Sequence, residues 1–423
     1  MKNASPVPAD APGLTPNRER WLLLSLAGVQ FTHILDFMIM MPLGPQFTRL
    51  LGISEAQFGM LVSAYTLAAG ASGLLATLFI DRFERKRLLL GLYAGFAVAT
   101  LGCGLAPGYL ALLAARIVAG LFGGVLSALV QTMVADAVPF ERRGRATGVM
   151  MASFSVSTVI GVPFSLWLAD RLGWQAPFLA IALMSAAIAA AAAAVLPRFD
   201  AHLHTAGRPS ALAGLRQVVR DPNHWRAFAL SALMLSAGFA IIPYLTIYLT
   251  ANVGLTASQV PLMYLAGGFA TLFTARLWGI LADRFGKVRT FRLIALAAMV
   301  PMLLVTHLPA SPLWAVLTVT TIFFIFVSGR MVPGMAIITS AAQPAVRGAF
   351  MSLNAALQSG AMGVAAWIGG LLIGRTADGS LAGFNATGWV GVAVSLCTVW
   401  LVGRLHLHTA PPARASSAPA ENI

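Results

Sequence analysis

A carboxylate within an apolar segment is the first group in this sequence that could do chemistry. Asp36 lies in the apolar run 21–42, and it alone of the 14 acidic residues sits well inside such a run. An ionisable group there is costly and marks a functional site by default. His33 precedes Asp36 by one helical turn on the same face, so it could share or relay a proton. The two residues predict proton binding and release; a hydrogen-bonded His33 with a structural role is the alternative.

Arg116 lies at a depth that suits a partner for Asp36. Asp36 follows the start of its run at Trp21 by 15 residues, about 22 Å along a helix. Arg116 lies about 7 residues, roughly 10 Å, from the start of the run 109–133. In a hydrocarbon core about 30 Å thick these depths agree to within a turn. Desolvation favours the protonated carboxylate and a guanidinium favours the ionised one. A change in their surroundings would load or unload a proton, whereas a static ion pair is the alternative.

Two more arginines lie inside apolar runs of the second half, where no acid accompanies them. Arg276 is expected to extend toward the cytoplasmic interface. Arg330 could do the same, or it could face a cavity, where an unpaired guanidinium would attract a carboxylate or phosphate of a substrate. Arg330 is therefore a candidate for substrate binding. The other candidates are polar residues within apolar runs: Gln30, Tyr244, Asn354 and Gln358.

Enzyme chemistry has no support in the sequence. It contains no nucleotide-binding glycine loop and no paired His and Glu residues at metal-site spacing. We therefore expect no enzyme activity, no cofactor, no bound metal and no ATP-driven transport by this chain alone.

The composition requires lipid as the solvent. The 423 residues are 58% hydrophobic and 10% charged, with a mean hydropathy of +0.81, whereas soluble domains carry roughly 25% charged residues. The net charge of +14 would suit a nucleic-acid partner, but the cations form short clusters between apolar runs. That pattern is typical of cytoplasmic loops. We expect a protein of the lipid bilayer that binds no nucleic acid.

Twelve apolar runs have the roughly 20 residues that a spanning helix needs. The predicted fold is an all-α membrane protein. Its predicted parts are a tail (1–20), a six-helix bundle (21–196), a cytoplasmic linker (197–224), a second six-helix bundle (225–405) and another tail (406–423), with both tails disordered. The runs are 21–42, 57–80, 88–106, 109–133, 145–168, 174–196, 225–250, 259–281, 290–308, 312–335, 346–373 and 386–405.

The distribution of Lys and Arg predicts the orientation. With the N-terminus inside, the inside segments hold 22 of these 28 residues, the outside segments hold 3, and 3 lie within apolar runs. Cytoplasmic loops carry such an excess. Both termini are therefore predicted to be cytoplasmic, which agrees with an even number of spans.

The chain also contains a duplication. Asp81 and Asp283 are 202 residues apart. A single register from residue 52 to residue 87 indicates two copies, each about half of the chain. The same offset aligns Arg82 with Arg284, Phe83 with Phe285, Arg87 with Arg289 and Gln57 with Gln259.

Arg330 departs from this repeat. It lies 214 residues after Arg116, whereas Arg347 follows Arg143 by 204 residues. Arg330 is therefore predicted to lie nearer the cytoplasmic end of its helix than the repeat position of Arg116.

Six spans, a basic linker, six spans and a repeated loop resemble the major facilitator superfamily over residues 21–405. The superfamily carries G-x-L-a-D-R-x-G-R-K between its second and third helices. The copy at 279–287, GILADRFGK, fits closely, while TLFIDRFERK at 77–86 has Thr77 and Glu84 at the glycine positions. The resemblance implies that charges of these loops gate the cytoplasmic side; fixing topology and capping helices is the alternative. The gating candidates are Asp81, Arg82, Gly279, Asp283, Arg284 and Gly286.

Three segments are similar to the drug:proton antiporter and arabinose (sugar) efflux branch of that superfamily. The resemblance places the first and fourth helices on one cavity, so we infer an Asp36–Arg116 pair, or an Asp36 that exchanges Arg116 for a proton. In the fifth helix the branch motif is altered because Val162 separates its glycine from its proline, a form that looks more like the sugar-efflux members. The segments are His33 to Asp36 with Pro42 to Pro45, Arg116 with Gly120, and Gly161 with Pro163.

The sequence and the resemblance together predict a secondary transporter of the bacterial inner membrane. It would export a small organic solute, of drug or sugar type, by proton antiport with alternating access. Its partners would be the solute, protons and lipid, and the superfamily resemblance implies a monomer. Two alternatives stay open. One is an uptake symporter or facilitator for a small organic anion, which would use Arg330. The other is a non-transporting membrane sensor or scaffold.

Overall fold

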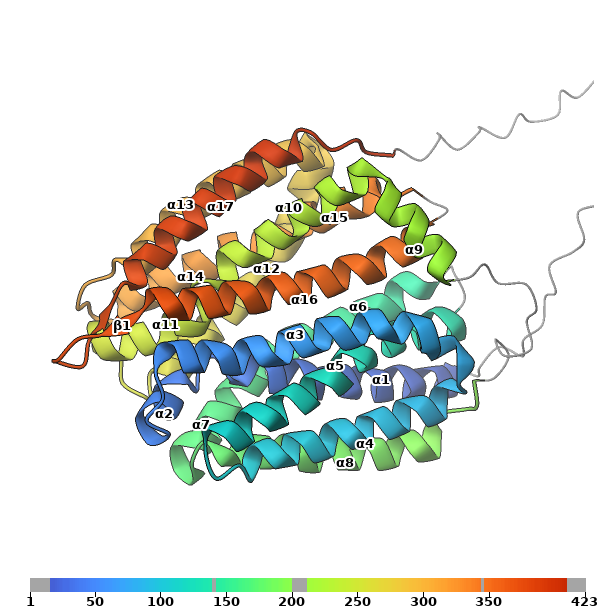
Figure 1. The fold of residues 1–423 in the computed structure, drawn as a ribbon, viewed down its shortest axis with the longest axis horizontal. Coiled ribbons are helices and arrows are strands. Elements are labelled where there is room, and N and C mark those ends of the chain that lie inside the picture. Colours follow the sequence, from blue (N-terminus) through green and yellow to red (C-terminus); the bar gives the residue numbers. More distant parts are fainter. Residues whose placement is uncertain (1–15, 139–141, 200–210, 344–345, 409–423) are drawn as a thin grey trace, which may run out of the picture.

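The structure is a computed structural model that describes residues 16–138, 142–199, 211–343 and 346–408. Twelve of its helices are long and apolar enough to cross a membrane. Most of them run along one common direction (Figure 1). In lipid every backbone polar group must be satisfied internally, which a long apolar run achieves by forming a helix. The predicted helical, twelve-span fold is confirmed.

The first six spans are α1, α3, α4, α5, the broken helix α6–η3–α7, and α8. Two short elements, α2 and η1, lie between them. The bounds are α1 (Pro16–Ile39), α2 (Gly44–Leu50), α3 (Glu55–Phe79), η1 (Ile80–Arg82), α4 (Arg85–Gly104), α5 (Tyr109–Ala137), α6 (Arg143–Val156), η3 (Ser157–Gly161), α7 (Val162–Leu172) and α8 (Gln175–Val195).

The second six spans are α10–α11–η5, α12, α13, α14–α15, α16 and α17. The bounds are α10 (Pro222–Phe239), α11 (Ile242–Tyr248), η5 (Leu249–Val253), α12 (Val260–Phe285), α13 (Lys287–Thr306), α14 (Leu313–Gly329), α15 (Met331–Ala341), α16 (Arg347–Leu372) and α17 (Phe384–Val402).

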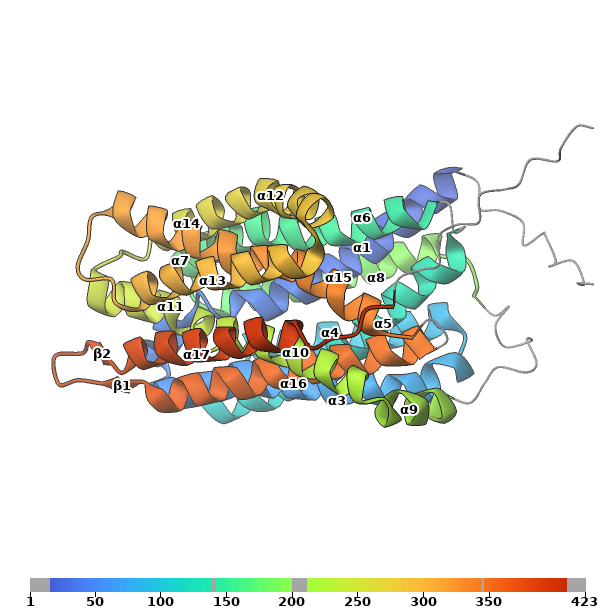
Figure 2. The same cartoon turned by 90° about the horizontal axis from the view of Figure 1, so that it is seen from above.

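Two elements lie outside the spans of the second half. Helix α9 (Ala211–Arg220) falls within the predicted linker and packs against α3 and α16. Strands β1 (Gly374–Arg375) and β2 (Leu381–Ala382) form a small antiparallel hairpin that the helical prediction did not include. The hairpin and α2 mark one end of the molecule, here called the hairpin end. Helix α9, the start of α1 and the end of α17 mark the other, the linker end (Figures 1 and 2).

Three spans are interrupted near prolines, because proline cannot donate a backbone hydrogen bond. A π-helical segment, Ser157–Gly161, precedes Pro163. Helix α10 ends just before Pro243, and α14 ends at Gly329, just before Pro333. Irregular backbone at membrane depth is tolerated where it lines a cavity. These breaks therefore indicate where a cavity between the halves is to be sought.

The two halves meet most closely along α3 and α16, which lie side by side (Figure 1). Ser63 Oγ donates a 2.6 Å hydrogen bond to the carbonyl of Gly363. A β-carbon added at Gly363 would lie 2.6 Å from Thr66 Oγ1, and one at Gly70 would lie 2.8 Å from the carbonyl oxygen of Ala356. Small residues permit this close approach of helices, so glycine holds the two halves in register here.

Large apolar side chains cover much of the outer surface. Leu110, Leu183 and Trp314 are 75%, 74% and 72% exposed, respectively. An apolar exterior is expected when the surrounding solvent is lipid.

Candidate functional site

The ion pair expected from the sequence is present inside the first half. Arg116 Nη1 on α5 lies 2.8 Å from Asp36 Oδ2 on α1, and both side chains are fully buried. The same nitrogen donates to the carbonyl of Asp36 at 3.3 Å, and Thr100 Oγ1 on α4 donates to Asp36 Oδ1 at 3.4 Å. Three helices of one half thus hold the carboxylate. Their contacts place Asp36 behind the wall of the cavity rather than in it.

Tyr65 separates this ion pair from the cavity. Its ring centroid lies 4.2 Å from Arg116 Cζ, which is cation–π geometry. The Tyr65 ring also stacks on the ring of Phe37, with 5.7 Å between the two centroids. The Tyr65 hydroxyl is buried and has no hydrogen-bond partner among the described residues. Tyr65 was not among the residues predicted from the sequence, because its one signal there is that of a polar aromatic residue in an apolar run.

His33 lines the cavity, and among the described residues no hydrogen bond or ion pair joins it to Asp36. Its ring lies 6.2 Å from that of Tyr65 and 6.1 Å from that of Phe96, measured between centroids. Its Nδ1 has no hydrogen-bond partner among the described residues. The structure therefore unites Asp36 and Arg116 and sets His33 on the cavity side of Tyr65. Direct proton sharing between His33 and Asp36 remains a prediction that requires movement.

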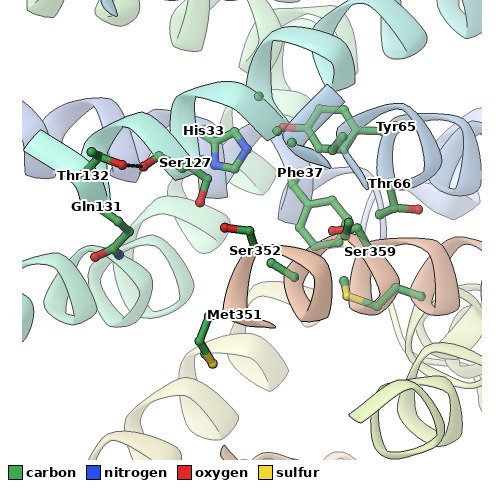
Figure 3. Close-up of a pocket in the computed structure, with 18 residues that line it drawn as sticks. His33, Phe37, Tyr65, Thr66, Ser127, Gln131, Thr132, Met351, Ser352 and Ser359 are labelled. Atoms are coloured by element: carbon green, nitrogen blue, oxygen red, sulfur yellow. Dashed lines mark hydrogen bonds between the residues drawn. The ribbon is translucent and has the colours of Figure 1, made fainter. Parts of the chain in front are cut away.

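The cavity has two adjoining parts. The first, here called the polar chamber, has a volume of about 450 Å³ and lies between α1, α3 and α5 of the first half and α16 of the second. Figure 3 shows side chains of both halves facing each other across it. Its polar lining includes His33, Ser127, Gln131, Thr132, Ser352 and Ser359.

The second part, here called the apolar chamber, has a volume of about 360 Å³. Phe37 and Met362 line both chambers, so the two adjoin at these residues. All three proline-associated breaks contribute to its wall. The lining is aromatic and methionine-rich, with two strongly polar side chains, Arg330 and Gln358.

Two of the five substrate-binding candidates line the cavity, namely Arg330 and Gln358. Gln358 Nε2 donates to Ser231 Oγ at 2.6 Å. Gln30, Tyr244 and Asn354 are buried and line neither chamber. Tyr244 donates to the carbonyl of Ala366 and so fastens α11 to α16. Which side of a helix faces a cavity depends on how the helix is rotated, and the sequence did not reveal that rotation.

The repeated loops differ at the position of the second motif glycine. Gly286 adopts φ +89°, a left-handed conformation that favours glycine, and caps α13. Glu84, 202 residues earlier, accepts hydrogen bonds of 2.9 Å from the backbone N–H groups of Lys86, Arg87 and Phe199. Burial alone would raise the pKa of Glu84, but these three donors outweigh it and hold the pKa below its ordinary value. The first loop is thereby tied to the segment that follows α8.

Gly279 is half-buried on α12, and the other gating candidates lie on the surface or beyond what the structure describes. Arg82, Asp283 and Arg284 are exposed. The side chain of Asp81 lies outside the described part of the structure. Close by, Arg85 Nε pairs with Asp136 Oδ2 at 2.6 Å, joining the first loop to the end of α5. The gating role of these loops stays a prediction.

The altered motif of the fifth span packs against α1. A β-carbon added at Gly161 would lie 2.8 Å from Leu35 Cδ1. Gly161 ends the π-helical segment and Pro163 follows in the first turn of α7. The break therefore lies directly beside the helix that carries Asp36.

One contact between the halves was missed by the sequence analysis. At the hairpin end Arg375 Nε and Nη2 donate to Glu55 Oε1 at 3.1 and 2.9 Å, which joins α3 to β1. Glu55 is 4% exposed. The two residues are 320 positions apart, so no local pattern could have paired them.

Comparison with known proteins is consistent with this architecture. The sequence profile of the Major Facilitator Superfamily matches residues 26–275 and 231–422. The Bacillus subtilis protein named as uncharacterized MFS-type transporter YceJ is 27% identical over 369 residues, which cover 86% of this chain and 92% of that protein. The chloramphenicol resistance protein of Streptomyces lividans is 30% identical over 386 residues, or 88% of this chain and 93% of the relative.

A solved structure has the same fold. It is the inward-facing, unoccupied crystal structure of a bacterial homolog to the human lysosomal transporter Spinster, with a TM-score of 0.73 and 15% sequence identity. The match covers 95% of this chain and all of that one.

Proposed function

The chain belongs to the major facilitator superfamily, and from this premise we propose that it exports a small organic solute in exchange for protons. In this proposal the two halves rock about the cavity so that it opens alternately to each side of the membrane. We place the protein in the bacterial inner membrane as a monomer, with the linker end and both termini in the cytoplasm, in keeping with its excess of positive charge inside.

The observation that carries the proposal is the buried Asp36–Arg116 pair behind Tyr65. Protonation of Asp36 would remove the charge that offsets Arg116, and an uncompensated buried guanidinium is strongly destabilising. The three helices around the pair would then favour a different arrangement. Because Tyr65 contacts both Arg116 and the cavity wall, that rearrangement would reach the solute.

Conformational exchange has matching features at both ends. The Glu55–Arg375 contact joins the halves at the hairpin end and would break when that end opens. Helices α3 and α16 pack through glycines, so they could slide along each other without large side chains having to separate. At the linker end the repeated loops would make the corresponding contacts in the other state. Charge contacts that exist in one of two states are a common switching device.

The direction of transport has one outside support. The Streptomyces relative is named for resistance to chloramphenicol, which suits removal of a drug-like compound from the cell. The apolar chamber, with its aromatic and methionine lining, suits such a compound better than a sugar.

Purified protein in liposomes with an internal pH-sensitive dye would test the proposal. Solutes of drug, sugar and organic-anion classes are screened for solute-driven proton movement in the native chain and in Asp36→Asn. Antiport predicts that protons and solute move in opposite directions, and that Asp36→Asn abolishes the proton movement. Asp378→Asn, the same change in an exposed hairpin turn, is the matched control and should transport normally. Solute flux that persists without protons in Asp36→Asn and in the native chain would contradict coupling.

A second candidate is uptake of a small organic anion by symport or facilitation. It is favoured by Arg330, which has no acidic partner among the described residues. Symport moves solute and protons in the same direction, and facilitation moves solute alone. A non-transporting sensor or scaffold would show no flux of any solute in the same assay.

A further inference from the structure

Arg330 is a buried cation without an acidic partner. It stands at the break between α14 and α15, lines the apolar chamber and is 1% exposed. Its Nη1 donates to Ser395 Oγ at 3.2 Å, and its Nε has no hydrogen-bond partner in the described part of the chain. Within the described chain no acidic side chain forms an ion pair with it. A charge in an apolar membrane interior is costly unless it is paired, so this guanidinium is available to an anion from outside the chain.

A glycine lies beside Arg330, at the position that an offset of 202 residues assigns to Asp36. Gly238 follows Asp36 by 202 residues, the offset that relates Asp81 to Asp283. A β-carbon added at Gly238 would lie 3.6 Å from Arg330 Nη2. Gly238 itself lines the apolar chamber. The second half therefore keeps an arginine beside this helix position but lacks the carboxylate that the first half supplies.

Resting on the proposed transport function, we propose that the apolar chamber binds organic anions whose acidic head lies beside Gly238, within reach of Arg330. The head would pair with Arg330 as Asp36 pairs with Arg116. A single guanidinium suits a head with one negative charge, and its planar fork matches a carboxylate. The ligand class is thus a carboxylate with an apolar body.

The walls of the chamber account for the apolar body. Phe37 of the first half stacks on Phe239 of the second at 6.0 Å, and Tyr264 lies 6.0 Å from Phe324. Such surfaces favour aromatic rings. Gln358, the other strongly polar side chain of the lining, is already bonded to Ser231. The chamber volume of about 360 Å³ falls in the range of pockets for small organic ligands.

Binding to the purified protein tests the proposal without reference to transport. Calorimetric titration with 2-naphthoate, 2-naphthamide and 2-naphthyl phosphate compares a carboxylate, a neutral amide and a phosphate on the same body. We expect naphthoate to bind at least tenfold more tightly than naphthamide, and naphthyl phosphate to bind more weakly than naphthoate. Arg330→Gln should abolish the preference for the carboxylate, whereas Arg330→Lys should retain part of it. Phosphate binding tighter than naphthoate would replace the carboxylate by a phosphate headgroup and overturn the stated class.

Gly238 provides a matched pair of variants. Gly238→Asp places a carboxylate where the ligand head would lie, while Gly238→Asn has the same size without the charge. Both displace Val327, whose Cγ1 would lie 3.2 Å from the new β-carbon. We expect Gly238→Asp to lose the naphthoate preference and Gly238→Asn to retain it. Equal preference in the two variants, or no naphthoate preference in the native chain, would overturn the proposal.

Thermal unfolding gives a readout that needs no ligand. A carboxylate beside an unpaired Arg330 should give Gly238→Asp a Tm at least about 2 °C above that of Gly238→Asn. An equal or lower Tm would show that Arg330 is not free to pair at this position. Failure of proton antiport in the liposome assay would leave both results standing, so the transport proposal and the anion proposal can fail separately.

Discussion

The two halves of the molecule each bury an arginine beside the same repeat position, and they differ in what they place there. In the first half Asp36 meets Arg116 at 2.8 Å, behind Tyr65 and away from the cavity. In the second half Gly238 places no side chain beside Arg330, which lines the cavity. One arginine is therefore paired with a carboxylate of its own half, and the other is open to a ligand. The two copies keep the same helical scaffold, but among the described residues only the first places a carboxylate beside its buried arginine.

The arginines themselves are not repeat equivalents. Arg330 lies ten residues too far along its helix to match Arg116, because it follows Arg116 by 214 residues whereas Arg347 follows Arg143 by 204. The long side chain compensates for part of this displacement, since helical side chains lean toward the N-terminus of their helix. The break at Arg330 separates α14 from α15 at the same point. Asp36 on α1 and Gly238 on α10 thus each lie beside a guanidinium group, but the two arginines occupy different levels along their own helices.

The largest expected effect separates the two arginines by stability. Arg116→Gln leaves Asp36 buried without its cation and should lower the free energy of unfolding by about 3–5 kcal/mol. Arg330→Gln removes a charge that has no acidic partner among the described residues. It should lower the free energy of unfolding by less than about 1 kcal/mol, or raise it. Thermal unfolding of the two variants in one detergent measures the difference.

A double variant provides the control for the first arginine. Asp36→Asn with Arg116→Gln removes both charges and should recover a large part of the stability lost in Arg116→Gln alone. Equal losses for Arg116→Gln and Arg330→Gln would show that the two environments are energetically alike and would end the comparison.

A smaller effect is expected from Tyr65, whose ring lies between Arg116 and the cavity. Tyr65→Leu removes the aromatic face over Arg116 and should cost about 2 kcal/mol, the value of a desolvated cation–π contact. Tyr65→Phe keeps the ring and removes a hydroxyl that has no partner among the described residues, so it should cost less than about 1 kcal/mol. Unfolding of both variants, with solute-driven proton flux as the second readout, checks this. Similar losses in both would assign the effect to the hydroxyl instead of the ring.

The fold and one ion pair could be predicted from the sequence because both depend on patterns that extend over whole helices. Apolar runs fixed the spans, and the depths of Asp36 and Arg116, with the resemblance, predicted their contact. Tyr65 and the Glu55–Arg375 contact were missed because helix rotation and contacts between distant segments leave no local pattern. The same limit explains why Gln358 lines the cavity while Tyr244 and Asn354 do not.

Gly238 shows a different limit. The role of Gly238 can be inferred only when it is compared with Asp36 in the first copy and when the position of the Arg330 side chain is known. The repeat offset alone points to a missing acid. Only the 3.6 Å approach of Arg330 Nη2 to the β-carbon position makes that absence a candidate binding site.

The smallest effects concern the repeated loops, where Glu84 replaces the glycine found at position 286. Gly286→Ala places a side chain at φ +89° and should cost about 1–2 kcal/mol at every pH, because no titratable group is involved. Glu84→Gln weakens the cap of α4 and the bond to Phe199, and should cost about 1 kcal/mol at neutral pH. Unfolding of both variants is measured from pH 7 downward.

The pH dependence distinguishes these two loops. The pKa of Glu84 is lowered in the folded protein from its ordinary value of 4.5, so between the two pKa values the folded state binds fewer protons than the unfolded state. Its contribution to stability is therefore complete above about pH 4.5 and is lost as the pH falls through the lowered pKa. The cost of Glu84→Gln should shrink in that range while the cost of Gly286→Ala stays constant. A cost of Glu84→Gln that is independent of pH would mean that the carboxylate charge does not hold the loop.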